Sequence, residues 1–278
     1  MHTHLRCLLL AFAAAASAAA SNTASAAANA QDTPSDTAVA TVKVTTTRDP
    51  VDKSYRKMIK GMERFEREHA YAPAASLRFQ LLPRTPDVKM EGITLRVAGD
   101  TLSAKVPVEP DNSFVLPRNE QLLREDAAVL ANRKTTSMTW RAAIVTPGLP
   151  AGTRRLGDMR LECRVGVEAG LVSNSSPLFG WLSNALTSAD EVCTSPNGNY
   201  LFFAERPLFA VRLRAGERSE TLPFHFLYAG GLPREELPFC DCQVLLDRTY
   251  YVPLWDASWP DDTLVEFEYM TDVPEAAP

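Results

Sequence analysis

The chain has 278 residues, with 29 Lys and Arg against 34 Asp and Glu, so its formal net charge is -5. This acidic excess argues against a nucleic-acid-binding protein, which usually carries a basic surplus. Hydrophobic residues make up 45% of the chain and charged residues 23%, a balance that is typical of a folded protein and not of a disordered one. The 20 prolines outnumber the 13 glycines, which indicates many stiff turns.

The first 30 residues have the layout of a secretory signal peptide. Arg6 supplies positive charge, residues 7–20 are almost purely apolar, and Ala28-Asn29-Ala30 offers small residues for cleavage after Ala30. The apolar run is shorter than the roughly 20 residues of a membrane-spanning helix, and no later segment comes close to that length. We therefore expect a periplasmic or secreted protein without a transmembrane span; an uncleaved N-terminal anchor is the alternative.

Export would place the later cysteines in an oxidising compartment, where four cysteines allow three pairings. We favour a bond between Cys163 and Cys193, because closing a loop of about 30 residues stabilises a fold by roughly 3–4 kcal/mol in the chain-entropy model. Cys240 and Cys242 are separated by one residue, so a bond between them would close a small, strained ring, and strained disulfides are reducible. This second pair is either structural or the basis of redox or metal chemistry.

Residues 31–52 are rich in Thr, Ala and Asp, and we expect a flexible arm there. Residues 53–70 are predicted to form an amphipathic helix, because their apolar residues recur at spacings of three and four. The opposite face is charged and includes Arg56, Lys57 and Lys60. The helix either packs on the body of the protein or contacts a membrane surface or a partner through residues 53–69.

From Ser76 onwards, short β-type runs alternate with Pro, Gly, Asp and Asn turn signals. The fold class predicted from this rhythm is mainly β, with two consecutive antiparallel β-sandwich-like modules over residues 74–147 and 155–274. One helix, over residues 176–186, would be inserted in the second module. The predicted strands are 76–82, 93–98, 102–108, 113–116, 127–130 and 138–145 in the first module, and 159–167, 200–203, 209–214, 220–227, 242–246, 249–253 and 264–269 in the second.

The two predicted modules show a weak internal repeat. Four blocks of the first module (95–100, 106–108, 114–116 and 126–129) align with four blocks of the second (211–217, 222–224, 251–253 and 262–265). The offset is about 116 residues for the first two blocks and about 136 for the last two. The second module would therefore carry an insertion near residues 225–249.

Residues 92–129 resemble carboxypeptidase-regulatory-like (prealbumin-like) β-sandwich modules, which use an Asp-Gly-x-Phe-type turn into a strand. The segment Asp111-Asn112-Ser113-Phe114 carries this resemblance, with Asn112 at the position of the family's glycine. The resemblance implies a small secreted sandwich with a binding or spacing role and without catalytic machinery. The whole chain also looks like uncharacterised exported proteins of Gram-negative bacteria.

The sequence contains no His-x-x-x-His zinc motif, no Gly-x-Ser-x-Gly nucleophile elbow, no phosphate loop and no dinucleotide-binding glycine pattern. We therefore predict no cofactor, no metal and no catalytic residue. Trp255, Trp259 and Asp261 are the candidate binding residues, since aromatic side chains in sandwich loops stack on sugar rings or partner side chains. Packing of these tryptophans in the core is the alternative.

The predicted function is a non-enzymatic envelope protein that binds or scaffolds, with an envelope protein or a glycan as its partner. Two other classes stay open. One is a thiol or redox protein that uses Cys240 and Cys242. The other is a hydrolase, for which His69 and His225 are the histidines left after export.

Overall fold

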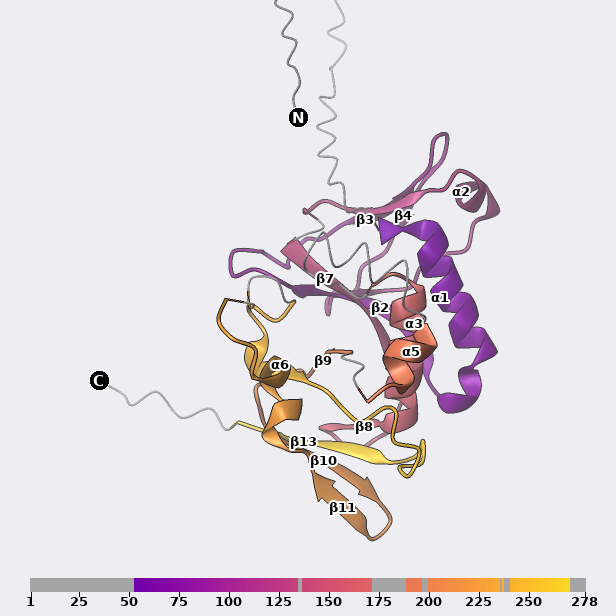
Figure 1. Cartoon of the computed structure of the whole chain (residues 1–278). Coiled ribbons are helices and arrows are strands. Elements are labelled where there is room, and N and C mark those ends of the chain that lie inside the picture. The colour runs from indigo at the N-terminus through magenta and orange to yellow at the C-terminus, as the bar shows by residue number, and fades with distance from the viewer. Residues whose placement is uncertain are drawn as a thin grey trace, which may run out of the picture. The chain divides into compact units, whose positions relative to one another are not determined.

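The computed structural model describes residues 53–134, 137–171, 189–196, 200–235, 237 and 241–270. Helical residues are nearly as frequent as strand residues, 26% against 31%. The strands pair antiparallel, as predicted. The helical share makes the fold mixed rather than mainly β, which corrects the predicted class. Figure 1 shows helices α1, α3 and α5 gathered on one side of the strands.

Helix α1 (Tyr55–Arg67) lies inside the predicted helical segment. Ser54 is its N-cap, because the side-chain oxygen accepts a hydrogen bond from the backbone N–H of Lys57 at 3.3 Å. The apolar face, with Met58 and Ile59, is buried as the spacing predicts. This face of α1 enters the core of the first half, and the helix also packs against α3 (Leu156–Glu168).

The first half of the described chain forms two sheets around one apolar core. Its strands, in sheet order, are β1 (Lys53–Ser54), β6 (Ala128–Ala131), β3 (Leu95–Ala98) and β4 (Ser103–Val106), then β5 (Ser113–Phe114), β2 (Ser76–Pro83) and β7 (Met138–Val145). A short helix, α2 (Glu120–Arg124), precedes β6. Trp140 of β7 is fully buried in this core.

The second half forms two further sheets around a second core that contains Trp259. Its strands, in sheet order, are β11 (Arg218–Thr221), β10 (Leu208–Ala215), β13 (Leu264–Tyr269) and β8 (Thr153–Arg155), then β12 (Thr249–Tyr250) and β9 (Phe202–Phe203). The short helical elements described in this half are α5 (Ala189–Thr194), α6 (Tyr228–Gly231) and the 3-10 turns η3 (Phe224–Phe226) and η5 (Leu246–Arg248). A further 3-10 turn, η1 (His69–Tyr71), follows α1 in the first half.

Three predicted strands of the second half are wrong. Residues 159–167 belong to α3, which is buried on most sides, so its apolar residues follow no helical period and resemble a buried strand. The predicted strand 220–227 ends at Thr221, and Pro223 follows, which has no N–H to give to a sheet. Residues 242–246 form a turn that enters η5. The predicted signal peptide, arm and inserted helix lie outside the described residues.

The two halves repeat the same strand register. Val97 of β3 faces Val129 of β6, and Leu213 of β10 faces Val265 of β13. These two pairs obey the offsets of 116 and 136 found in the sequence alignment. The hairpins β3–β4 and β10–β11 share their register under the same offset of 116. The internal repeat is therefore confirmed at the level of individual residue pairs.

The repeat extends to the elements around the hairpins. Helices α1 and α3 each have 13 residues, and each follows a short strand: β1 pairs with β6 in the first half, and β8 pairs with β13 in the second. Phe79 faces Phe114 in the first half, and Phe202 faces Tyr250 in the second, with ring centroids 5.6 Å apart in both. The counterpart of Phe114 is thus Tyr250 and not Tyr251, which corrects the sequence alignment by one residue.

The halves differ most between the hairpin and the next strand. Residues 107–112 connect β4 to β5, whereas residues 222–248 connect β11 to β12. The rise in offset from 116 to 136 is therefore an insertion in this second connection, where the sequence predicted it. We call residues 223–248 the insertion, and the structure describes 223–235, 237 and 241–248 of it.

Candidate binding surface on the insertion

The insertion begins with η3 and continues into a turn of unusual backbone conformation. Four consecutive residues have positive φ: Tyr228 (52°), Ala229 (54°), Gly230 (72°) and Gly231 (70°). The two glycines adopt this left-handed region freely, but a residue with a Cβ atom is strained there by roughly 1–2 kcal/mol. Such strain persists only where surrounding contacts impose it, and it gathers at functional sites.

Specific contacts impose this conformation. The Tyr228 hydroxyl donates a hydrogen bond to the carbonyl oxygen of Leu208 at 2.5 Å, which fastens the turn to β10. The backbone N–H of Gly230 donates to the carbonyl oxygen of Leu227 at 2.9 Å, and Leu227 itself bridges to Tyr250 of β12. Ala229 is buried, with 2% of its surface exposed. The turn is therefore attached to the sheets of the second half.

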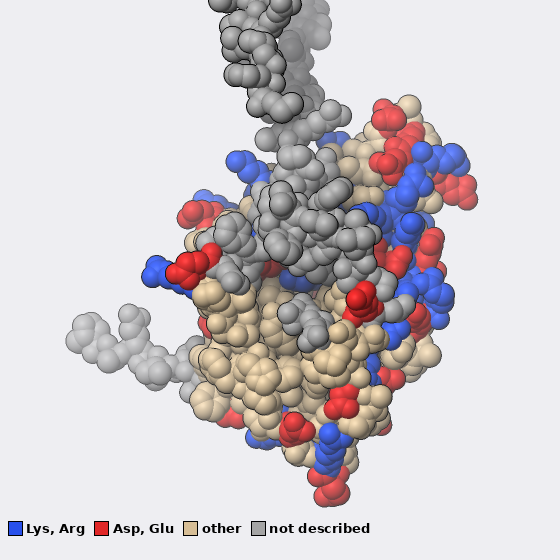
Figure 2. Space-filling view, in the orientation of Figure 1, with Lys and Arg blue, Asp and Glu red and all other residues tan. Residues whose placement is uncertain are grey.

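Aromatic side chains surround this turn and form a surface that we call the aromatic patch: Phe224, Phe226, Tyr228, Tyr251 and Trp255. Phe224 is 66% exposed, the largest exposure among the large hydrophobic side chains of the described residues. The rings of Phe226 and Trp255 are nearly parallel, at 19° and 6.3 Å between centroids. The rings of Phe224 and Tyr228 lie 5.4 Å apart. Figure 2 shows an expanse without charged side chains in the region where Figure 1 places α6.

Tyr251 joins the patch to the turn. A Cβ atom at Gly230 would lie 3.7 Å from its ring, an ordinary van der Waals distance, so the ring lies next to the turn. Burial raises the pKa of Tyr251, and the nearby Arg141 guanidinium opposes that rise. Arg141 belongs to β7, so the patch reaches a charged group of the first half.

The insertion is anchored at its far end by a buried aspartate, Asp241, which is 3% exposed. The Thr139 hydroxyl donates to one carboxylate oxygen at 2.6 Å, and Arg141 Nη2 lies 3.2 Å from the same oxygen. Arg84 Nε lies 3.2 Å from the other oxygen. Burial lowers the pKa of Lys53 to about 8, although the Asp241 carboxylate acts to raise it. We call Asp241 with Thr139, Arg84 and Arg141 the anchor cluster; it joins the insertion to the β2–β7 sheet.

The cysteines on either side of Asp241 are Cys240 and Cys242. Cys242 is fully buried and disulfide-bonded, and its partner lies outside the described residues, as does Cys240. The other predicted disulfide is confirmed, since Cys163 and Cys193 are bonded with their sulfur atoms 1.98 Å apart. It fastens α5 to α3.

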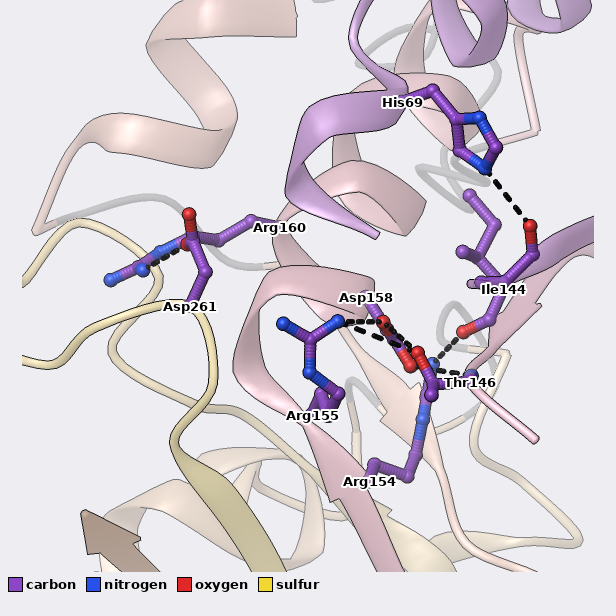
Figure 3. Close-up of polar contacts among 9 residues, drawn as sticks. His69, Ile144, Thr146, Arg154, Arg155, Asp158, Arg160 and Asp261 are labelled. Carbon is purple, nitrogen blue, oxygen red and sulfur yellow. Dashed lines mark hydrogen bonds and ion pairs between the residues drawn. The ribbon is translucent and has the colours of Figure 1, made fainter. Parts of the chain in front are cut away.

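The predicted binding residues of the 255–261 loop do not form one surface. Trp255 belongs to the aromatic patch, but Trp259 is 1% exposed, with the Arg218 guanidinium 3.5 Å from its ring centroid. Asp261 accepts a hydrogen bond from Arg160 at 2.6 Å, as Figure 3 shows. Core packing, the alternative for the tryptophans, therefore holds for Trp259.

The predicted basic residues of α1 are also separated. Arg56 pairs with Asp126 at 3.0 Å and donates to the carbonyl oxygen of Leu123 at 2.8 Å. The Lys57 side chain lies against Gly170, and Lys60 is exposed. These contacts favour the interpretation of α1 as a helix packed on the body of the protein. Contact with a membrane or partner through it stays a prediction.

A second group of buried ion pairs joins α3 to β7 and β8, and Figure 3 shows the contacts of Asp158 within it. Asp158 accepts hydrogen bonds from the backbone N–H and the hydroxyl of Thr146 at 2.7 and 2.8 Å, and Arg155 lies 3.4 Å away. Glu162 pairs with Arg154 at 2.6 Å. Buried charges persist in a fold when they are paired in this way, so we interpret this group as structural.

The two histidines that the structure describes both contact neighbouring groups. His69 Nε2 lies 3.0 Å from the carbonyl oxygen of Ala75, and His225 lies against the ring of Phe226 at 4.6 Å between centroids. Within the part of the chain that the structure describes, no group of three or more His, Cys, Asp or Glu side chains is placed to hold a metal ion. The same part contains no helix that is both long and apolar enough for a bilayer.

Comparison with known proteins adds no relative. The chain matches no protein-family profile, no curated protein and no solved structure.

Sequence reasoning identified Trp255 but missed the rest of the patch and the anchor cluster. The segment Phe224-His225-Phe226 falls in the predicted strand 220–227, whereas the structure has the 3-10 turn η3 there. The local sequence signal for the turn that follows is the pair Gly230-Gly231.

Proposed function

We propose that this chain is an exported, non-enzymatic envelope protein that binds a partner through the aromatic patch. The observation that carries the proposal is the location of the patch: three of its five rings, those of Phe224, Phe226 and Tyr228, lie on an insertion into one of two halves that share their strand registers. The insertion also contains a strained backbone at Tyr228 and Ala229. Added segments and local strain both concentrate where proteins bind other molecules.

The proposal includes the arrangement and location of the protein. Two sandwich-like modules, over 74–147 and 155–274, would form the scaffold that presents the patch, and the repeated registers support this arrangement. A signal peptide cleaved after Ala30 would deliver the chain to the periplasm or the medium. The Cys163–Cys193 disulfide supports an oxidising location. An N-terminus at Gln31 in the exported protein would agree with this route, and an intact N-terminus would contradict it.

Site-specific crosslinking in cells tests the proposed surface. A photo-reactive phenylalanine analogue replaces Phe224 in the full chain, and the same analogue replaces Val115, which is 53% exposed on the first half. We expect a discrete crosslinked product from position 224 that is lost when Trp255→Ala is added. Position 115 should not give this product.

A product that forms equally from both positions, or that survives Trp255→Ala, would mean that the patch is not the binding surface. The urea midpoint of each variant serves as the control for folding. Because Phe224 is mostly exposed, its replacement should leave that midpoint unchanged.

A further inference from the structure

The aromatic patch has a composition that restricts its ligands. Its large partly exposed side chains are rings rather than aliphatic chains, and two of them, Phe226 and Trp255, are nearly parallel. Flat ring faces stack on flat apolar faces and leave room for polar groups at the edges. Tyr228 adds a ring whose hydroxyl is already bonded to Leu208, so its face rather than its hydroxyl is available. The patch is therefore suited to a ligand with flat C–H faces.

The described charged residues that lie near the patch or follow it in sequence include both signs. The 3-10 turn η5, which contains Asp247, packs against α6, and burial together with the Asp247 carboxylate raises the pKa of Tyr228. The Arg248 guanidinium donates to the carbonyl oxygen of Glu205 at 2.8 Å and lies 4.0 Å from Asp247. Arg234 and Glu235, which are both exposed, follow the turn in sequence. Anionic lipid surfaces and nucleic acids call for a basic surplus, which these charges of both signs do not supply.

Polar groups near the patch match hydroxyl groups. His225 is exposed, and an imidazole ring offers both a donor and an acceptor when neutral. Asp247 is exposed and offers carboxylate oxygens, which accept from hydroxyl donors. Stacking faces bordered by such groups complement a molecule that alternates C–H faces with hydroxyls.

We infer that the aromatic patch binds a glycan chain, with sugar rings stacked on Phe224, Phe226 and Trp255 and hydroxyls bonded to His225 and Asp247. This inference rests on the proposed function and names the ligand class of that site. An apolar peptide is the competing class, and the experiment separates the two.

Two glycan probes test the inference on the full exported chain. One is protein-free cell-wall sacculi, with binding measured by co-sedimentation. The other is a soluble hexamer of β-1,4-linked N-acetylglucosamine, with binding measured by calorimetry. We expect the chain to bind at least one probe, and Phe224→Ala and Trp255→Ala each to weaken that binding about tenfold, the loss of one good stacking contact. Phe209→Ala is the matched control, because Phe209 is 63% exposed on β10 outside the patch.

The possible failures are distinguishable. If neither probe binds but position 224 still gives a Trp255-dependent protein crosslink, the glycan inference is wrong and the proposed function stands. If neither probe binds and the crosslink is also missing, both are wrong. If a probe binds and the patch variants bind as well as Phe209→Ala, the glycan site lies elsewhere and the inference is overturned.

Discussion

Replacement of Asp241 by asparagine is the sharpest test of how the insertion is held. The change removes one negative charge from a position that is 3% exposed, and it keeps the size of the side chain. Arg141 is then left with its guanidinium buried, at 8% side-chain exposure, and Arg84 with 18%. Both lose the carboxylate that lies 3.2 Å from each.

Leaving a buried charge without its partner costs about 3–5 kcal/mol, and the amide oxygen of asparagine can still accept from Thr139. Arg84 is partly solvated, which reduces the penalty. We therefore expect Asp241→Asn to lower the free energy of unfolding by about 3 kcal/mol, which urea denaturation followed by far-UV circular dichroism measures.

Asp126→Asn supplies the matched control. It is the same chemical change in an ion pair at 3.0 Å with Arg56, but the two side chains are 71% and 45% exposed. Exposed pairs contribute about 0–1 kcal/mol, so this variant should unfold close to the wild-type midpoint. The reasoning is refuted if the two substitutions cost the same, because burial would then not govern the strength of the anchor cluster.

Two further predictions concern other parts of the fold. In Gly61→Ala, the new Cβ would lie 2.7 Å from the Cβ of Ala169, so we expect a loss of about 1 kcal/mol in unfolding free energy, since overpacking outweighs the gain in helix propensity. The loss should shrink or reverse in an Ala169→Gly background, and an unchanged loss there would show that this contact is not responsible. Burial lowers the pKa of Lys53 from 10.5 to about 8. Between these two pH values the unfolded chain binds the Lys53 proton and the folded chain has lost it. The free energy of unfolding should therefore rise as the pH goes from about 8 towards 10. Lys53→Met should remove that rise, as measured by the difference in unfolding free energy between the two proteins at each pH; parallel curves would contradict the lowered pKa.

Local patterns were enough to predict several elements. The spacing of apolar residues in α1 is short-range information, and so are the turn residues at Gly99 and Gly216 that close the two hairpins. The expected bond between Cys163 and Cys193 is confirmed, and in the chain-entropy model its loop of 30 residues contributes to stability. The internal repeat was also visible in local patterns, because each half contains the same order of hairpin, strand and turn.

Other features depend on contacts that are distant in sequence. Helix α3 was taken for a strand because it is buried on most sides, which removes the helical period from its apolar residues. The turn at Tyr228 and Ala229 contradicts the local preference of both residues, and contacts with Leu208 and β12 decide its conformation. The anchor of Asp241 was not predictable because its partners lie a hundred residues or more earlier in the chain.

These distant contacts explain why the patch can keep one geometry before it meets a ligand. The insertion is held at three places: Asp241 on the first half, the Leu227–Tyr250 bridge on β12, and the Tyr228 hydroxyl on β10. The backbone strain at Tyr228 and Ala229 amounts to a few kcal/mol, and the turn would relax if any of these attachments were weak. Because η3 and the turn, which carry three of the rings, are already fixed, little conformational entropy would be lost on binding a ligand. A preorganised surface of this kind favours a stiff ligand over a flexible one, which is a reason to propose a sugar chain rather than an extended peptide.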